Sequence, residues 1–377
     1  MNFMDGHCFK LWFSFLAIMA ISDRSISQID PLATKETKAL YQHLFKLRAK
    51  GVLFGHQDAM AYGLNADKSR WIGGNNTSDV KTITGEHPAI IGQDLGHLEL
   101  DHTVNLDSVP FQHIREIAIQ TYLNGGINTI SWHLNNPLDL NKTAWDKMDS
   151  TIAKLLIEKK QWQHYEQLLD KLSSFFKSIK APNGKMVPII FRPYHEHTGS
   201  WFWWGAGHCT TDQYKLFWQK TVDYLVKKKN VHNLLFAYST DNFRSEAHYL
   251  ERYPGDQYVD LFGFDTYHRN APVSDSNFIA NAKRMVGTIK KLGEERHKLY
   301  AITETGLERV SEPDWWTRVL YPIIQNTGLS YVLVWRNGRP DHYYAPYPGS
   351  DSEADFKKFF NLPGTLFEKE LKHLYEK

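Results

Sequence analysis

Eight short apolar segments, rich in β-branched and aromatic residues, recur along the chain and predict eight strands. Most of them are apolar at nearly every position, which is typical of parallel strands that are covered on both faces. The predicted strands are Gly51–His56, Ala89–Asp94, Ile127–His133, Val187–Glu196, Asn233–Thr240, Val259–Tyr267, Leu299–Glu304 and Leu329–Arg336.

Segments with helical spacing of apolar residues alternate with these strands, and one more, Lys35–Lys50, precedes the first strand. No linker rich in Ser, Gly or Pro divides the chain. Eight strand–helix units in one domain over residues 28–377 predict an α/β fold, a closed (β/α)₈ TIM barrel, rather than an open doubly wound sheet. The other predicted helices are Val109–Leu123, Gln161–Ile179, Asp212–Lys229, Asn277–Leu292 and Asp314–Gln325.

The N-terminus has the pattern of an export signal. Lys10 precedes an apolar run, Leu11–Ile21, which is too short to cross a bilayer as a mature helix. Ser25-Ile26-Ser27 then offers a cleavage site. The alternative is a buried N-terminal helix. We expect residues 1–27 to be a signal peptide and the protein to be periplasmic or extracellular.

Charge and composition narrow the choice of partner. The 44 Lys and Arg residues nearly cancel the 42 Asp and Glu residues, which argues against nucleic acid and against a membrane surface as partners. Aromatic residues make up 14% of the chain. Aromatic faces pack on the C–H faces of sugars, although large cores also use them. We expect a monomer, but nothing in the sequence reports the oligomeric state.

Polar and aromatic side chains stand at the end of every predicted strand. In a TIM barrel these ends meet at one face, where the chemistry takes place. The pattern therefore predicts an active site at that face. The strand-end residues are His56, Gln57, Asp58, Gln93, Asp94, Trp132, His133, His195, Glu196, Ser239, Thr240, Asp241, Asp265, Tyr267, Glu304, Trp335 and Arg336.

Two of these strand ends are glutamates, Glu196 and Glu304. Hydrolysis of a glycosidic bond with retention needs two carboxyl groups about 5–5.5 Å apart, one protonated and one ionised. Counting by twos, Arg192 and Tyr194 share a strand face with Glu196, and Tyr300 and Ile302 share one with Glu304. The alternative is that each glutamate forms a structural ion pair, with Arg192 or Arg336 for example.

The segment Arg192-Pro-Tyr-His-Glu-His-Thr-Gly-Ser-Trp-Phe-Trp-Trp-Gly205 resembles the acid/base motif of glycoside hydrolase family 26. That family consists of retaining (β/α)₈ enzymes, of which β-mannanases are the best known. Ile302-Thr-Glu304-Thr-Gly306 resembles its nucleophile strand. His197-Thr198 is a departure, since Met-Asn or a similar pair is expected there. Further similar segments are Phe264–Tyr267, Trp335–Asn337, Trp132–His133, Leu53–Asp58 and Tyr343–Tyr347.

The resemblance implies that Glu196 is the acid/base and Glu304 the nucleophile. We expect Trp201 to form a wall that stacks on sugar and Trp335 a platform beneath it, whereas Trp203 and Trp204 belong more to the core. The full expected set of substrate-binding residues is Trp132, His133, Arg192, His195, Trp201, Asp265, Tyr267, Trp335 and Arg336.

The expected activity is hydrolysis of β-1,4-mannosidic linkages in mannan, galactomannan or glucomannan, either within chains or with release of mannobiose. Two alternatives stay open: the same chemistry on another β-glycan, such as mixed-linkage glucan or xylan, and a non-catalytic barrel that binds polysaccharide. No cofactor is expected. The His-rich and acidic stretch Gly96–His102 is expected to form a wall of the cleft rather than a metal site. The loops 95–110 and 337–352 are long enough to block one end of the cleft.

Overall fold

The computed structural model describes residues 28–74 and 76–376, so the predicted signal peptide lies outside the described residues. Within this part of the chain, no helix is both long enough and apolar enough to cross a membrane.

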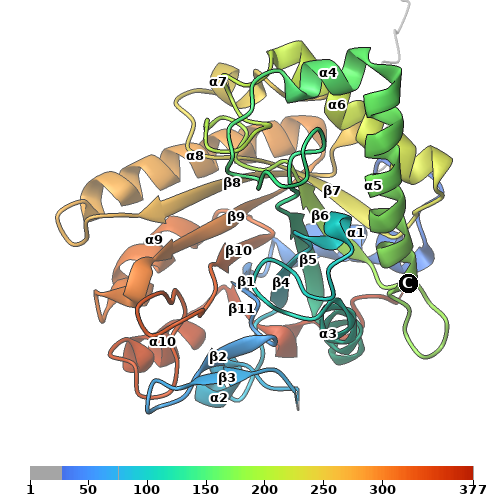
Figure 1. The fold of residues 1–377 in the computed structure, drawn as a ribbon. Coiled ribbons are helices and arrows are strands. Elements are labelled where there is room, and N and C mark those ends of the chain that lie inside the picture. Colours follow the sequence, from blue (N-terminus) through green and yellow to red (C-terminus); the bar gives the residue numbers. More distant parts are fainter. Residues whose placement is uncertain (1–27, 75, 377) are drawn as a thin grey trace, which may run out of the picture.

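Eight parallel strands close into a barrel, which confirms the predicted (β/α)₈ fold (Figure 1). Each strand pairs with the next along the chain, and the last pairs with the first, with Leu53 opposite Tyr331. A short ninth strand, β11 (Thr365–Leu366), also pairs with β1. The barrel strands are β1 (Val52–Gln57), β4 (Ile90–Asp94), β5 (Ile127–Trp132), β6 (Ile189–Pro193), β7 (Leu234–Thr240), β8 (Leu261–His268), β9 (Leu299–Leu307) and β10 (Tyr331–Val334).

Helices surround the barrel and include all the predicted ones, although Asp314–Gln325 is a π-helical turn followed by a short α-helix. The α-helices are α1 (Lys35–Leu47), α2 (Asp79–Thr84), α3 (Phe111–Asn124), α4 (Thr151–Ile157), α5 (Lys159–Ser178), α6 (Thr211–Asp223), α7 (Glu246–Leu250), α8 (Asp275–Arg296), α9 (Tyr321–Ile324) and α10 (Glu353–Phe360). The remaining elements are the hairpin strands β2 (Tyr62–Leu64) and β3 (Arg70–Ile72), the π-helical turns η2 (Tyr224–Lys228) and η5 (Trp316–Leu320), and the 3₁₀ turns η1 (Leu98–Leu100), η3 (Asp256–Tyr258), η4 (Glu308–Val310) and η6 (Glu368–Glu370).

The core has two layers, and the alternation of side chains along each strand separates them. In β1, Leu53 belongs to the inner cluster that fills the barrel, whereas Val52 and Phe54 pack outward against the helices. Helix α1 supplies Leu40 and Leu44 to the inner cluster. The inner positions near the carboxyl ends of the strands are therefore the ones whose side chains reach the mouth of the barrel.

Candidate active site

Glu304 reaches the mouth because β9 contains a β-bulge. The register between β8 and β9 shifts there: Phe264 pairs with Ile302, but Asp265 pairs with Glu304. Thr303 is the extra residue, and a bulge of this kind re-aims the side chains that follow it. The expectation that Tyr300 and Ile302 share a face with Glu304 is therefore wrong, since both pack in the outer layer.

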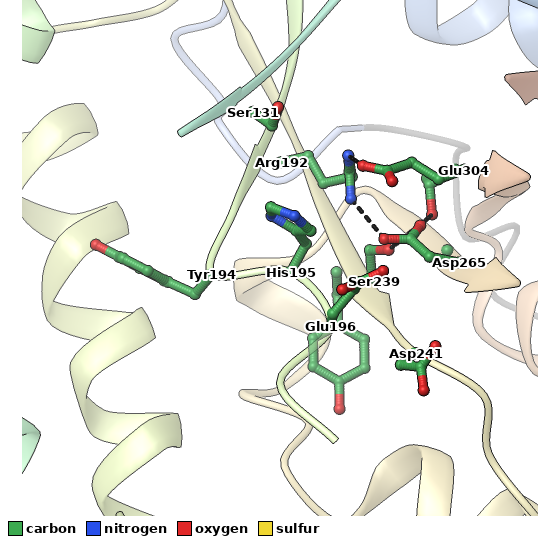
Figure 2. Close-up of polar contacts among 12 residues, drawn as sticks. Ser131, Arg192, Tyr194, His195, Glu196, Ser239, Asp241, Asp265 and Glu304 are labelled. Atoms are coloured by element: carbon green, nitrogen blue, oxygen red, sulfur yellow. Dashed lines mark hydrogen bonds and ion pairs between the residues drawn. The ribbon is translucent and has the colours of Figure 1, made fainter. Parts of the chain in front are cut away.

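The Glu304 carboxylate is held by two donors. One guanidinium nitrogen of Arg192 donates to its Oε1 atom, and the Tyr267 hydroxyl donates to its Oε2 atom at 2.7 Å. Another guanidinium nitrogen of Arg192 donates to Asp265 at 2.8 Å, as Figure 2 shows. Asp265 in turn accepts hydrogen bonds from the Ser239 hydroxyl at 2.9 Å and the Thr303 hydroxyl at 2.7 Å. The position of Glu304 is thus fixed by a buried network.

One guanidinium serves two carboxyl groups in this network. Burial lowers the pKa of Arg192, but the charges of Asp265 and Glu304 outweigh burial and raise it overall. Burial raises the pKa of Asp265 to about 7, although the Arg192 charge opposes the rise. Burial, followed by the Glu304 charge, raises the pKa of Tyr267 well above its ordinary value. The Tyr267 hydroxyl therefore keeps its proton and acts as a donor.

Glu196 lies beyond the end of its strand, in a turn with unusual backbone angles. Strand β6 ends at Pro193, and both Tyr194 (φ 47°) and Glu196 (φ 53°) are in the left-handed region, which non-glycine residues rarely adopt. The alternation of side chains breaks here, so the expectation that Arg192, Tyr194 and Glu196 share one face is wrong for Tyr194. Its side chain points toward the helices, away from Arg192 (Figure 2), and its hydroxyl contacts Tyr165 and Thr221.

The Glu196 carboxylate has a different environment from that of Glu304. Its Oε2 atom accepts a hydrogen bond from the Trp201 indole at 2.7 Å. Burial raises its pKa well above the ordinary value, and the negative charges of Asp265, Glu304 and Asp241 raise it further. Glu196 is therefore protonated under conditions in which an exposed glutamate is ionised.

The two glutamates line one cleft with a volume of about 910 Å³. Five of the expected substrate-binding residues line it with them: His133, His195, Trp201, Tyr267 and Trp335. Arg192 and Asp265 lie beneath the surface of the cleft, 3% and 0% exposed, and act on Glu304 rather than on a ligand.

Two further expected substrate-binding residues, Trp132 and Arg336, also do not line this cleft. Trp132 is completely buried in the outer layer, and its indole donates to Glu99 at 3.0 Å. Trp132 occupies an outward position of β5, so the expectation of a sugar contact is wrong. The guanidinium of Arg336 turns away from the cleft to Asp107 and to the Tyr62 hydroxyl.

Other expectations for the surroundings also need correction. Trp203 and Trp204 are wholly core rather than partly so, and their indoles donate to the carbonyl groups of Leu134 at 3.0 Å and His195 at 2.8 Å. The stretch Gly96–His102 contributes no residue to the described lining of the cleft. Its Glu99 instead supports Trp132.

Several residues of the cleft are not among the predicted substrate-binding residues. Trp145, in the loop between β5 and α4, stacks on His133 with the ring centroids 5.1 Å apart and is 49% exposed. It is distant from any strand end, so only the high aromatic content hinted at it. The remaining lining residues are Phe202, Asp241, Asn242, Thr266, Arg269, Ser274, Asn277, Phe278 and Asn281. Asp241 alone among these stood in a predicted strand end.

The pKa values of two histidines at the cleft are shifted in opposite directions. His133 Nδ1 lies 2.7 Å from Asp94 Oδ2, and although burial lowers the pKa of His133, the Asp94 charge raises it overall. The edge of His195 faces His133, with the ring centroids 4.6 Å apart. Burial, followed by the nearby Arg192 and His133 charges, lowers the pKa of His195 well below its ordinary value. His195 therefore offers a neutral ring beside the glutamates.

Among the described residues, His195, Asp265 and Glu304 bring potential metal-ligating atoms to within 4.8 Å of one another. The guanidinium of Arg192 already bonds to both carboxylates of this group. The Arg192 guanidinium therefore takes the place that a metal ion would need between these carboxylates.

Comparison with known proteins agrees with this geometry. Residues 29–301 match the model of glycosyl hydrolase family 26. A mannan endo-1,4-beta-mannosidase of Bifidobacterium adolescentis is 33% identical over 366 residues, which cover 90% of this chain and 35% of that protein. The chain thus spans about a third of the length of that relative.

Two solved structures extend the likeness to almost entire chains. A family 26 beta-mannanase from Bacteroides ovatus superimposes with a TM-score of 0.86 at 42% identity, covering 91% of this chain and 98% of that one. A family 26 protein from a Muricauda species gives a TM-score of 0.83 at 33% identity, covering 93% and 96%. With the family matched over most of its barrel, the chain belongs to glycosyl hydrolase family 26.

Proposed function

We propose that this protein hydrolyses β-1,4-mannosidic linkages in mannan, galactomannan or glucomannan with retention of configuration, with Glu304 as nucleophile and Glu196 as acid/base. One observation carries the assignment: two carboxyl groups line the same cleft in opposite electrostatic settings. The substrate is supported by the relatives, which are named mannan endo-1,4-beta-mannosidase and beta-mannanase.

Glu304 suits the role of nucleophile because both of its carboxylate oxygens are held by donors. Arg192 supplies a positive charge and Tyr267 a hydroxyl donor. A carboxylate attacks an anomeric carbon as the anion, and a neighbouring cation and a hydroxyl donor are suitable partners for that form. Both donors act on defined oxygen atoms, so they also orient the carboxylate toward the cleft.

Glu196 suits the role of acid because burial and neighbouring acids favour its protonated form. In the first step it gives a proton to the glycosidic oxygen while Glu304 forms a bond to the anomeric carbon. That bond neutralises Glu304 and removes one source of repulsion, so Glu196 then serves as the base that takes a proton from water. Water attacks the anomeric carbon and releases Glu304.

Azide rescue separates the two roles. With 2,4-dinitrophenyl β-mannobioside, Glu196→Ala should accumulate a glycosyl-enzyme that azide converts to a β-mannosyl azide. Glu304→Ala should instead yield the α-azide, because azide replaces the nucleophile directly. Each variant should lose about two or more orders of magnitude in turnover on mannan without azide, at an unchanged melting temperature. The reverse pairing of azide products would exchange the two roles.

The identity of the sugar is tested separately from the chemistry. Initial rates of reducing-sugar release on linear mannan, galactomannan, glucomannan, lichenan and xylan should be highest on the mannose-containing polymers. A higher rate on lichenan or xylan would favour the alternative β-glycan substrate. Absence of turnover on every polymer, with binding retained, would favour a non-catalytic barrel.

We also propose that the enzyme releases mannobiose from one end of the chain. Apart from Trp335 and Glu304, the described lining of the cleft comes from the loops after β5, β6, β7 and β8 and from α8. On the other side of the mouth, Asp107 after β4, Tyr62 of the hairpin and Arg336 after β10 join in one cluster. We propose that this cluster closes that side. Chromatography of the early products from long mannan should show mannobiose as the main product from the first time point. A mixture of sizes would indicate cleavage within chains.

Export and oligomeric state are proposals that need their own measurements. The apolar run in residues 1–27 supports export to the periplasm or the medium. Sequencing the N-terminus of protein recovered from those fractions should give a start at Gln28, whereas a start at Met1 would contradict cleavage. Light scattering coupled to gel filtration should give the mass of one chain, in keeping with the proposed monomer.

A further inference from the structure

His197, directly after the proposed acid/base, is a buried histidine for which the mechanism has no use. Its side chain is 0% exposed and lies between the rings of Tyr214 and Tyr238, with centroids 4.5 Å and 4.7 Å from its own. Neither ring nitrogen has a hydrogen-bond partner among the described residues. The His197 ring is therefore held by packing alone.

The two tyrosines that clamp His197 are fixed by their own hydroxyl groups. The Tyr214 hydroxyl donates to the carbonyl of Tyr194 at 2.9 Å, and the Tyr238 hydroxyl donates to the carbonyl of Tyr249 at 2.8 Å. Tyr214 thus contacts the acid/base turn twice, through the His197 ring and through the Tyr194 backbone. Tyr214 therefore touches the chain on both sides of Glu196.

The backbone of the turn is anchored, but its left-handed residues leave it under strain. The Glu196 N–H donates to the Ser239 carbonyl at 3.0 Å, and the His195 carbonyl accepts from the Trp204 indole at 2.8 Å. Positive φ angles at Tyr194 and Glu196 cost free energy that the surroundings must offset. The packed His197 ring is one part of those surroundings.

The groups that face His197 all disfavour a charge on it. Tyr214 of α6 and Tyr238 of β7 pack against its ring and are neutral. Arg252, after α7, and His248, within α7, add positive potential. Burial is the largest influence, and together these groups hold the pKa of His197 well below its ordinary value. A proton on this ring would have no acceptor nearby.

We propose that His197 is a positioning residue: its neutral ring, clamped by Tyr214 and Tyr238, holds the turn that aims Glu196, and protonation of the ring releases that turn. The inference rests on the proposed acid/base role of Glu196. It predicts acid sensitivity at the position at which this chain departs from the Met-Asn pair expected after the acid/base.

Two substitutions separate the ring's packing from its protonation. His197→Met keeps an apolar side chain of similar volume that cannot take a proton. His197→Ala leaves a cavity between the two tyrosines. His87→Met is the control for loss of a buried histidine away from the mouth: His87 lies before the amino end of β4, burial lowers its pKa to about 4, and its ring nitrogens, unlike those of His197, contact Ser78 and Asn76.

The readout is kcat/KM on two substrates, mannopentaose and 2,4-dinitrophenyl β-mannobioside. The dinitrophenolate departs without help from an acid, so a misplaced Glu196 lowers kcat/KM on mannopentaose alone. His197→Ala should lower it there by about tenfold or more and leave it on the activated substrate within about twofold. His197→Met and His87→Met should leave the ratio between the two substrates unchanged.

The second readout is acid inactivation, followed as residual activity after incubation at pH 3 to 7. An unfolded histidine has a pKa of about 6.5, so a buried neutral histidine costs stability progressively as pH falls below that value. His197→Met should shift the midpoint of inactivation to lower pH. An equal loss on both substrates for His197→Ala, or a wild-type midpoint for His197→Met, would overturn the proposal.

The same experiment distinguishes this inference from the proposed function. Glu196→Ala should show the selective loss on mannopentaose in a stronger form. If Glu196→Ala lacks that selectivity, the acid/base assignment itself is wrong. If Glu196→Ala shows it and His197→Ala does not, only the role of His197 fails.

Discussion

At the residue scale, one barrel mouth gives two glutamates different surroundings. Glu304 is held by a guanidinium and a hydroxyl, whereas Glu196 has a single indole donor and is surrounded by acids. Burial with like charge favours the protonated form of Glu196, whereas Glu304 is paired with a cation. The residues that create this difference are therefore the ones whose substitution should move the pH profile.

Trp201→Phe should move the basic limb of the profile to higher pH. The Trp201 indole hydrogen bond lowers the pKa of Glu196, against the larger effect of burial, and phenylalanine keeps an aromatic face without this donor. Without it the pKa of Glu196 rises, so the acid form persists to higher pH. The pH dependence of kcat/KM measures this directly. A basic limb that stays in place or moves to lower pH would contradict the assignment of that limb to Glu196.

Asp265→Asn should have the opposite effect on the same limb. After burial, the Asp265 charge is the largest influence that raises the pKa of Glu196, so its removal should bring the limb to lower pH. Arg192 would then neutralise Glu304 alone and make it a weaker nucleophile. We expect kcat/KM to fall by about one to two orders of magnitude. Ser239→Ala, which removes one donor to Asp265, is a milder control.

Alternation along the strands explains which site residues the sequence could identify. His133, Asp265 and Trp335 stand at positions whose side chains point into the barrel. Trp132 stands at a position whose side chain points outward, where the helices bury it. The turn after Pro193 and the bulge at Thr303 break this parity. No local sequence pattern predicts either irregularity, which is why the sequence predicts the wrong face for Tyr194.

At the scale of elements, the strands were easier to predict than the connections. Long apolar strands and amphipathic helices such as α5 and α8 have strong periodicity. The short helices α4 and α7 and the hairpin β2–β3 have too few residues for a period to emerge. Trp145 belongs to such a connection, and its place in the cleft depends on tertiary packing rather than on local sequence.

The start of α6 offers a test of local stability. The Thr210 hydroxyl accepts from the Gln213 N–H at 3.2 Å, and the Gln213 side chain accepts from the Thr210 N–H at 3.0 Å, which makes a capping box. Thr210→Ala should reduce the free energy of unfolding by about 1 kcal/mol, with kcat unchanged. Urea denaturation measures the loss, and Thr211→Ala is the control at the neighbouring, partly buried position. Equal stabilities for the two variants would show that the box contributes nothing.

The cluster of loops beside the cleft can be opened by one substitution. Asp107 pairs with Arg336, so Asp107→Ala removes the link between the loops after β4 and β10. We expect the share of products longer than mannobiose to rise severalfold in early digests of linear mannan. The control is Asp101→Ala. Asp101 lies on the same loop as Asp107 and is far more exposed, and it pairs with Lys171 of α5. An unchanged product distribution in Asp107→Ala would show that this pair does not close the cleft.

At the scale of the whole molecule, closure of the barrel is what creates the site. Pairing of β1 with β10 brings the ends of the sheet together, and the cleft then collects side chains from five successive strands, β5 to β9, and from the end of β10. Continuous apolar strands, alternating helices and the absence of a linker were enough to predict this closure. The cluster beneath Glu304 was only partly predictable, because Ser239 and Thr303 take their roles from neighbours that are distant in sequence.

The central claim is that Glu196 and Glu304 act by double displacement. Proton NMR of the first products released from mannopentaose, recorded before mutarotation, tests it most directly. The account predicts that the new reducing end appears first as the β-anomer and converts slowly to the equilibrium mixture. Initial appearance of the α-anomer would show direct displacement by water, and Glu304 would then not be the nucleophile.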